Sequence, residues 1–486
     1  MRRSWLRPSI RSMAMAVAAG ALVLVGGNLS AQTLGSSPSG FPGTTGTTQD
    51  ESAPRLIPGH GAEIFRVWAR AGDPRAGGGA VFLAVSRPTA PGSQPVGQTL
   101  LEIKPAEKGV NPRDPMLAVG PSGHLALAYQ WVRFEPRAKQ IRVALSTDGG
   151  KTWDQPATPV DSSGKAFSPQ PGWTADGGLV VIWEDEGRGD RAFDVYARRS
   201  PDGGKTWEPQ QLLSRFPNQR PADIYARPIL VTDGGNRLWT VWVGLRDGRS
   251  SFYLNRSVDG GRTWTTPLAL SGDGQSVFGH QLARSGDRLL LVWNDTRSGH
   301  DRIYSASSDD GGAAWTPPIR VDHIPETSST DASSASVLLG PDGQALVAWQ
   351  DGRNGRPDIF LAKSTDGGRT WGAEDQRMDT DEPGTAVSRF PKLARAKDGR
   401  VAITWEDDRD GFEAVYLRVR GAGSQAANWG PEVLATPPAT KLAFRLPEVV
   451  WGEDGQLYLA WEVWDHTLSP ARTTKRVDFH TLQVNP

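Results

Sequence analysis

The sequence predicts an all-β protein that folds as a single β-propeller of four-stranded antiparallel blades. Three observations support this: an eight-residue turn motif that recurs every 51–58 residues, an apolar run that recurs in phase with it, and 56 Gly and 37 Pro among 486 residues. Self-similarity at this period is typical of solenoids and propellers. Closing four-stranded units into a ring also protects the sheet edges from pairing with other chains.

The turn motif reads Ser146-Thr-Asp-Gly-Gly-Lys-Thr-Trp153 in its first copy. Five copies are well kept, and a sixth, from Ser424 to Trp429, is degenerate. An Asp can hydrogen-bond the backbone of its own turn, Gly accepts a positive φ, and Trp packs between strands. The motif is therefore predicted to be structural, with the aspartates Asp148, Asp202, Asp259, Asp310 and Asp366.

An apolar run ends in an aromatic residue once in every unit, 14 residues after a Pro or a small residue. The run ends are Tyr129, Trp183, Trp242, Trp293, Trp349, Trp405 and Trp461. Each unit thus contains a strand, a Gly turn, the apolar run, a polar loop, a third strand, the turn motif and a last strand. Seven blades are predicted, with six as the alternative; six or eight would require an end segment to pack differently.

The ends of the chain differ from the repeats. Residues 1–31 place four Arg before an apolar stretch and small residues, which is typical of a secretory signal cleaved after Ala31. The stretch is too short to span a bilayer, so a secreted or periplasmic protein without a membrane span is expected. Residues 32–54 form a flexible Gly/Ser/Thr/Pro linker and residues 55–486 the propeller. Because the last unit lacks a fourth strand, the N-terminal strands within 81–103 are expected to close it.

The composition argues against several classes of function. Lys plus Arg and Asp plus Glu both number 54, so no nucleic-acid partner is expected. The absence of Cys excludes a thiol nucleophile and Cys-based zinc sites. No metalloprotease, phosphate-loop or dinucleotide motif is present, so neither a metal nor a cofactor is predicted. The acidic stretch from Asp379 to Glu382 lacks a calcium-loop pattern and is interpreted as solvated.

The turn motif resembles the Asp box, Ser-x-Asp-x-Gly-x-x-Trp, of the sialidase superfamily of neuraminidase-like BNR-repeat propellers. The resemblance covers about residues 110–480. It implies boxes on the face opposite the active site and, if the protein is an enzyme, a glycoside hydrolase of the exo-α-sialidase type with a Tyr nucleophile. It also implies an Arg-Ile-Pro motif early in the chain. The nearest sequence, Arg55-Leu-Ile-Pro58, is one residue longer and is expected to belong to the linker.

Four arginines precede the Pro that begins each unit: Arg113, Arg227, Arg389 and Arg445. These positions lead into the inner strand beside the central funnel, and guanidinium groups bind carboxylates bidentately. In a ring of seven units, all of them except Arg227 would converge on one side. The superfamily resemblance implies a sugar carboxylate held by three such Arg. Pairing with nearby acids such as Asp114, Glu382 or Glu448 is the alternative.

Two tryptophans that the repeat does not explain, Trp131 and Trp464, fall in ligand-face loops. They are expected to cluster with Arg113 and Arg445 and to contact an acidic sugar, with ordinary core packing as the alternative. A further pattern, Asp-x-Arg-x-Gly, follows the run-end Trp in three units. The pattern recurs in several blades, whereas a single ligand would not contact each blade in the same way. It is therefore interpreted as a local salt bridge, with a ring of ligand contacts as the alternative.

Among the seven Tyr, Tyr225 alone lies at the start of an inner strand, two residues from Arg227. It is the candidate nucleophile, and Asp223 and Asp114 are the candidate acid/base residues. The sequence thus favours a secreted sialidase-like propeller that binds an acidic glycan or other small anionic ligand, with hydrolysis as a further expectation. The alternative is a non-catalytic propeller that binds an envelope protein, which the poor match to the Arg-Ile-Pro and Tyr/Glu motifs favours.

Overall fold

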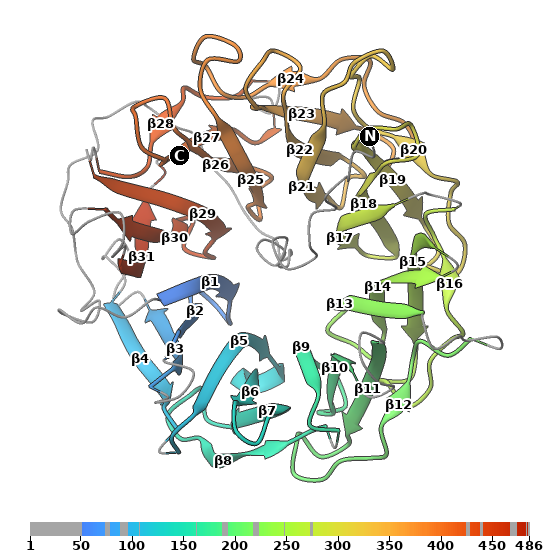
Figure 1. Ribbon diagram of the computed structural model, residues 1–486, viewed down its shortest axis with the longest axis vertical. Coiled ribbons are helices and arrows are strands. Elements are labelled where there is room, and N and C mark those ends of the chain that lie inside the picture. The colour runs from blue at the N-terminus through green and yellow to red at the C-terminus, as the bar shows by residue number, and fades with distance from the viewer. Residues whose placement is uncertain are drawn as a thin grey trace, which may run out of the picture.

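Eight antiparallel sheets follow one another around a ring, and each sheet is one blade of a β-propeller (Figure 1). The computed structural model describes residues 51–482 and 484, apart from 73–77, 88–95, 106, 162, 187–192, 217–222, 247, 273–275, 424–427, 438–440 and 467–473. In this part of the chain, seven sheets have four strands and the last has three. The predictions of seven blades and of six are therefore wrong, because the ring has eight blades, numbered 1–8 in chain order.

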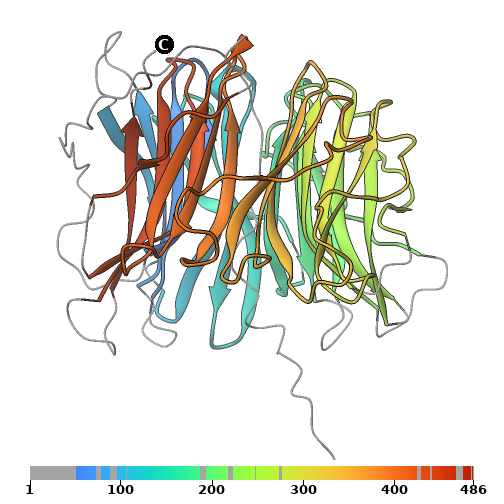
Figure 2. The ribbon, with the colours of Figure 1, turned by 90° about the horizontal axis from the view of Figure 1, so that it is seen from above.

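The first strand of every blade lies nearest the ring axis (Figure 1). These inner strands are β1 (Glu51–Pro58), β5 (Val110–Val119), β9 (Ala166–Trp173), β13 (Ile224–Thr232), β17 (Val277–Ser285), β21 (Ala332–Leu339), β25 (Ser388–Arg395) and β29 (Leu442–Trp451). Seen edge-on, the strands run between the two faces of the ring (Figure 2). Every turn therefore lies on one face or the other.

The second strands carry the apolar runs and are the most deeply buried. They are β2 (Ile64–Arg70), β6 (Leu125–Arg133), β10 (Leu179–Asp185), β14 (Leu238–Arg246), β18 (Arg288–Asp295), β22 (Ala345–Asp351), β26 (Val401–Asp407) and β30 (Leu457–Asp465). Their side chains point to opposite sides of the sheet and pack against both neighbouring blades, so both sides are apolar. These strands supply the seven run-end aromatic residues, and the six that are Trp, from Trp183 to Trp461, are fully buried.

The third and fourth strands complete each blade toward the outside. The third strands are β3 (Ala80–Arg87), β7 (Ala138–Ser146), β11 (Asp194–Ser200), β15 (Arg249–Ser257), β19 (Arg302–Ser308), β23 (Asp358–Ser364), β27 (Ala414–Arg420) and β31 (Thr474–Leu482). The fourth strands are β4 (Val96–Ile103), β8 (Asp154–Pro159), β12 (Gln211–Leu212), β16 (Leu268–Ala269), β20 (Ile319–Arg320), β24 (Gln376–Arg377) and β28 (Val433–Leu434). The described residues also include a short 3-10 helix, η2 (Pro121–Gly123), and no helix that is long and apolar enough to cross a membrane.

The N-terminal strands form a blade of their own, which corrects the expectation that they close the last blade. Strand β1 pairs with β2, and β1 to β4 make a complete four-stranded sheet. The ring closes instead by side-chain packing, in which Leu56 and Ile64 of blade 1 contact Tyr458 and Ala460 of blade 8. Because β1 begins at Glu51, the end of the expected linker belongs to the propeller. The predicted signal and the rest of that linker lie outside the described residues.

A β-bulge interrupts each inner strand at the same place. In seven blades the bulge contains a residue with positive φ: Asp114, Ser168, Arg227, Gly279, Ser334, Phe390 and Leu446, with φ of 50–62°. Only one of the seven is Gly, although L side chains are strained in this region. Because the conformation recurs around the ring, the strain is a property of the propeller. The bulge also breaks the alternation of side chains along the strand, which changes what each inner strand presents to the axis.

The predicted structural role of the turn motif is confirmed. In the first copy, the hydroxyl of Ser146 donates to Asp148 at 2.8 Å and accepts from the backbone N–H of Gly150 at 2.8 Å. Asp148 accepts from the backbone and the hydroxyl of Thr152, which hold the pKa of Asp148 at about 2. The motif joins the third strand to the fourth, on the face opposite the turns between the second and third strands.

The interpretation of the Asp-x-Arg loops as local salt bridges is also confirmed. In blade 6, Arg353 pairs with Asp351 at 2.7 Å and stacks on the ring of Phe360 at 4.0 Å, while the indole of Trp349 donates to Asp351 at 2.8 Å. The equivalent pairs in blades 5 and 7 are Arg297 with Asp295 and Arg409 with Asp407. These loops therefore hold their own blades together.

Candidate functional site

A hydrogen bond between neighbouring blades fixes the bulges in three places. The side chain that follows the run-end Trp accepts from the backbone N–H of the positive-φ residue in the next blade. The three bonds run from Arg227 to Glu184 at 2.7 Å, from Phe390 to Gln350 at 2.9 Å and from Leu446 to Glu406 at 3.2 Å. We call this bond the inter-blade latch.

Glu184 is the latch residue between blades 3 and 4, and it is half-buried. Its second oxygen accepts from the hydroxyl of Ser168 at 2.9 Å. Burial raises the pKa of Glu184, and the negative charge of Asp114 on β5 raises it further. The two hydrogen bonds and the positive charge of Arg227 act in the opposite direction. Glu184 is thus half-buried as a residue, both of its carboxyl oxygens are hydrogen-bonded, and its carboxyl group is easier to protonate than that of an ordinary Glu.

Asp114 is the positive-φ residue in the bulge of blade 2, and it is close enough to Glu184 for its charge to influence that carboxyl group. Its side chain is exposed to solvent, yet loss of hydration raises the pKa of Asp114, against the effect of Arg113 and Arg55. Asp114 lies on inner strand β5, the strand of blade 2 nearest the ring axis (Figure 1).

Arg113 and Arg227 flank these two carboxyl groups. Both side chains are exposed, and among the described residues neither forms an ion pair. Arg227 is itself the positive-φ residue of its bulge, whereas Arg113 immediately precedes the equivalent residue. Blades 2, 3 and 4 thus combine two available guanidinium groups with two carboxyl groups. We call Arg113, Asp114, Glu184 and Arg227 the blade 2–4 site.

Lys139 of β7 borders the blade 2–4 site. Its ammonium group lies 3.5 Å from the ring centre of Phe167 and 3.8 Å from a carboxylate oxygen of Glu186. Burial lowers the pKa of Lys139; Glu186 and Glu184 raise it, while the positive charge of Arg113 lowers it. Lys139 therefore adds a third cation and a partly exposed aromatic ring to this part of the wall.

Three of the other predicted ligand residues gather at blades 7 and 8, where a buried Glu joins them. Arg445 pairs with Glu413 and lies over the ring of Trp464 at 4.6 Å. Burial raises the pKa of Glu406 to about 7, and Arg445 and Arg389 oppose the shift. Glu406 is only 2% exposed, so its carboxyl group is closed to a ligand. We call Arg389, Glu406, Arg445 and Trp464 the blade 7–8 cluster.

The expected cluster of Arg113, Arg445, Trp131 and Trp464 does not form as one group. Blade 1 lies between blades 8 and 2, which separates Arg445 from Arg113. Trp131 is 9% exposed and packs in the core beneath the guanidinium of Arg142 at 4.0 Å. The core-packing alternative therefore holds for Trp131, whereas Arg445 and Trp464 do contact each other as predicted.

Arg55 lies in an inner strand and not in a linker, which is a second correction. It pairs with Glu448 of blade 8 at 3.4 Å, and Lys392 of blade 7 pairs with the same carboxylate at 3.0 Å. Its charge also lowers the pKa of Asp114. Arg55 thus interacts both with Glu448 of blade 8 and with Asp114 of blade 2.

Tyr225 faces the core between blades, away from Arg227. Its side chain is fully buried, its hydroxyl donates to Asp223 at 3.0 Å, and its ring packs against Phe216 and Trp242. Residues two apart in a strand normally share a side, but the bulge after Ala226 breaks that alternation. The nucleophile role of Tyr225 and the acid/base role of Asp223 stay predictions, and this burial argues against both.

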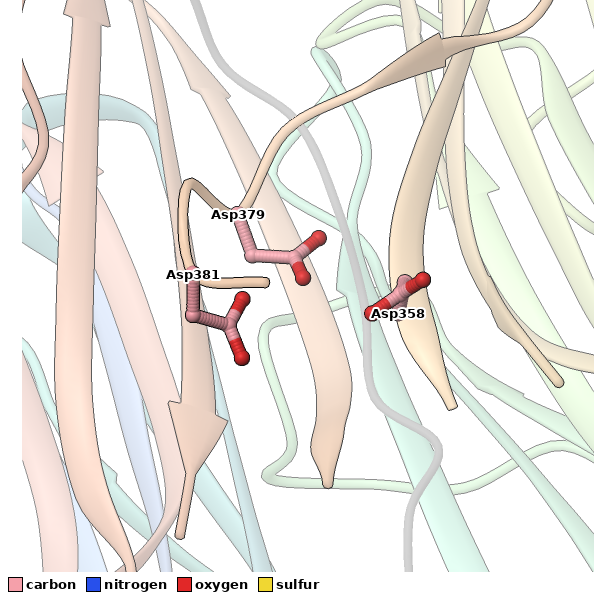
Figure 3. A group of neighbouring side chains, drawn as sticks. All are labelled: Asp358, Asp379 and Asp381. Carbon is pink, nitrogen blue, oxygen red and sulfur yellow. The ribbon is translucent and has the colours of Figure 1, made fainter. Parts of the chain in front are cut away.

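Three carboxylates in blade 6 and its connection to blade 7 lie close enough together to ligate a cation: Asp358, Asp379 and Asp381 (Figure 3). One guanidinium nitrogen of Arg377 donates to all three, at 3.0, 2.5 and 2.6 Å. Burial raises the pKa of Asp379 to about 8, with Asp358 adding to the shift. Arg377 therefore supplies the positive charge that this cluster needs.

Sequence reasoning missed two latch residues, Glu184 of the blade 2–4 site and the buried Glu406, which is closed to a ligand. Each follows a run-end Trp, so a repeat signal placed them on a second strand. Nothing in one sequence shows that this position reaches the bulge of the next blade.

Comparison with known proteins agrees with the propeller. The family model described as "BNR repeat-like domain" matches residues 98–294. A xyloglucanase of Paenibacillus sp is 30% identical over 263 residues, which is 47% of this chain and 23% of that protein. A sialidase of Micromonospora viridifaciens is 26% identical over 326 residues, which is 64% of this chain and 44% of that protein.

Among solved structures, an ulvan lyase matches with a TM-score of 0.47 and 13% identity, covering 78% of this chain and 98% of that one. The repeats, the Asp boxes and these sequence matches define a BNR-repeat β-propeller. The family-model match and the two sialidase relatives support a place in the sialidase-like BNR propeller superfamily. The match spans less than half the length of the xyloglucanase and of the sialidase.

Proposed function

We propose that this propeller binds a carboxylated glycan at the blade 2–4 site. The observation that carries the proposal is the pair of exposed guanidinium groups, Arg113 and Arg227, which form no ion pair in the described part of the chain. Guanidinium groups bind carboxylates through two parallel hydrogen bonds. The similarity to proteins named sialidase and xyloglucanase supports a carbohydrate as the ligand.

The location of the charges favours this ligand over a large basic partner. Asp114 and Glu184 alone would repel an acidic sugar, but Arg113, Arg227 and Lys139 surround them with positive charge. Carboxyl and guanidinium groups together can hydrogen-bond sugar hydroxyls while the cations hold the carboxylate. Phe167 offers a partly exposed ring, and aromatic faces are common in ligand sites.

Calorimetric titration of the full-length chain with N-acetylneuraminic acid, glucuronic acid and galacturonic acid, each free and as an oligosaccharide, tests the proposal. Arg113→Gln and Arg227→Gln should each weaken binding at least tenfold, or about 1.4 kcal/mol. Arg389→Gln is the matched control, because Arg389 has the position of Arg113 in blade 7. Binding of no acidic sugar, or equal weakening in all three variants, would contradict the proposal and favour the alternative of an envelope-protein partner.

Export is part of the proposal, because glycans of this kind occur outside the cytoplasm. The N-terminal 31 residues support it through their Arg-rich start and apolar stretch. N-terminal sequencing of the protein recovered from the medium or periplasm should begin at Gln32. A chain that stays in the cytoplasm and begins near Met1 would refute this part.

A further inference from the structure

The latch needs an oxygen that accepts a hydrogen bond, and it does not need a negative charge. Between blades 6 and 7 a neutral amide, that of Gln350, accepts from Phe390 at 2.9 Å. Between blades 3 and 4 the carboxyl group of Glu184 accepts the equivalent bond at 2.7 Å. Burying a carboxyl group costs free energy, so the latch bond by itself gives no reason for a carboxyl group at Glu184.

The same comparison separates Glu184 from Glu406. Both are latch residues with raised pKa, but Glu406 is 2% exposed whereas Glu184 is half-buried. Glu184 also has an exposed carboxyl group beside it, that of Asp114, and Glu406 has Arg445, Arg389 and Glu413 near it. Of these two latch glutamates, Glu184 is thus the less buried one, and the carboxyl group within electrostatic reach of it belongs to an exposed residue, Asp114.

We infer that Glu184 and Asp114 are a catalytic carboxyl pair that hydrolyses a glycosidic bond of the carboxylated glycan held by Arg113 and Arg227. This inference rests on the proposed function, since it takes the same ligand at the same site. Two carboxyl groups on either side of the scissile bond are the usual machinery of glycoside hydrolysis. This pair replaces the buried Tyr225 as the candidate for chemistry.

The charges around the pair assign the two roles. Burial raises the pKa of Asp114, but Arg113 and Arg55 lie near it and favour its negative form, which suits a general base. Glu184 is more enclosed, and the negative charge of Asp114 favours its protonated form, which suits a general acid. When Glu184 is protonated, its carboxyl oxygens keep lone pairs that can still accept from Ser168, so the proton is free to point to the glycosidic oxygen.

The reaction balances with water as the only co-reactant. Glu184 donates its proton to the glycosidic oxygen while the bond from that oxygen to the anomeric carbon breaks, and the electron pair goes to the oxygen. A water molecule attacks the anomeric carbon and gives its proton to Asp114. The products are two sugars with new hydroxyl groups. Transfer of the proton from Asp114 to Glu184 through water restores the starting state.

The pair should give a bell-shaped pH profile. Activity needs Asp114 charged and Glu184 protonated, so it falls when pH drops below the first titration or rises above the second. The charged groups that face Glu184 are Asp114 from β5, Lys139 from β7 and Arg227 from β13. Arg113→Gln and Lys139→Gln should therefore shift the limbs of the profile upward in pH.

Activity of the full-length chain on alkyl and 4-methylumbelliferyl glycosides of N-acetylneuraminic, glucuronic and galacturonic acids tests the inference. Glu184→Gln should lower kcat/KM about 100-fold or more on an alkyl glycoside. It should lower kcat/KM less on the aryl glycoside, whose leaving group needs no proton. Asp114→Asn should lower both equally; Asn tolerates positive φ, so the fold should persist.

Glu406→Gln is the matched control, because it removes a carboxyl group from the same latch position in a buried setting. It should keep full activity. Full activity of Glu184→Gln, equal loss in Glu184→Gln and Glu406→Gln, or no hydrolysis of any glycoside by the wild-type chain would each overturn the inference. In the last case, sugar binding by calorimetry would still support the proposed function, so the two failures are distinguishable.

Discussion

Blades 3 and 6 solve the same structural problem with different chemistry. Glu184 and Gln350 follow equivalent Trp residues and accept equivalent hydrogen bonds, at 2.7 and 2.9 Å. Around Glu184 the neighbouring inner strands β5 and β13 supply Arg113, Asp114 and Arg227, whereas around Gln350 the neighbouring inner strands β17 and β25 supply basic residues and no carboxyl group. The amide of Gln350 shows what the scaffold needs, so the carboxyl groups at blades 2 and 3 indicate function.

The largest effect should come from the part that both blades share. Trp183 and Trp349 are both fully buried at the ends of their apolar runs. Trp183→Ala and Trp349→Ala should each lower the free energy of unfolding by about 3–5 kcal/mol, because each leaves a cavity. Urea unfolding measures this loss. A much smaller loss in one of the blades would show that the two scaffolds are not equivalent.

The next effect concerns the buried latch carboxyl group, Glu406. Its pKa is about 7 in the folded state against 4.5 ordinarily, so the folded chain keeps a proton that the unfolded chain releases between these values. Stability from this group is therefore present below pH 4.5 and is lost as pH rises toward 7. Relative to Glu406→Gln, the wild type should lose on the order of 3 kcal/mol across this window. If the unfolding free energies of the wild type and of Glu406→Gln differ by the same amount at pH 4.5 and at pH 7, the raised pKa of Glu406 is contradicted.

Removal of the latch should have an intermediate effect. Glu184→Ala and Gln350→Ala each leave a backbone N–H without its partner, which should cost about 1–3 kcal/mol. Glu184→Gln keeps an accepting oxygen and should cost less than about 1 kcal/mol by the same reasoning. Thermal and urea unfolding of the three variants compares them. A cost of Glu184→Gln equal to that of Glu184→Ala would mean that the latch does need a charge.

The smallest effect should come from the opposite face. Hydrogen bonds from Thr152 hold the pKa of Asp148 at about 2, so this group stabilises the fold above its ordinary pKa and loses that effect as pH falls toward 2. Asp148→Asn should weaken acid tolerance slightly and leave sugar binding unchanged. A loss of sugar binding would show that the Asp-box face takes part in the site.

The sequence repeat predicts the propeller fold, but it does not reveal blade 1. Pro54 precedes Trp68 by 14 residues, which is the spacing of the seven recognised units, yet blade 1 has no Asp box to draw attention to it. Missing this blade also misplaced the arginines, because the expected convergence of Arg113 with Arg445 assumed that their blades were neighbours. The repeat predicts which blades are adjacent across the ring closure only when every blade has been recognised in the sequence.

The candidate site was predictable only where its residues adjoin the repeat signals. Arg113, Asp114 and Arg227 stand beside Pro115 and Pro228, which recur at the start of the repeat unit in the sequence, so their place on an inner strand could be inferred. Tyr225 could not be placed, because a bulge reverses which side its side chain takes. Glu184 depends on contact between separate blades, and that contact exists only in the folded ring.

A crystal structure of the full-length chain with a bound carboxylated sugar tests the central claim most directly. The account predicts the sugar carboxylate within hydrogen-bonding distance of Arg113 and Arg227, with the glycosidic oxygen facing Glu184. A carboxylate bound at Arg389 and Arg445 of the blade 7–8 cluster, or on the Asp-box face, would contradict it.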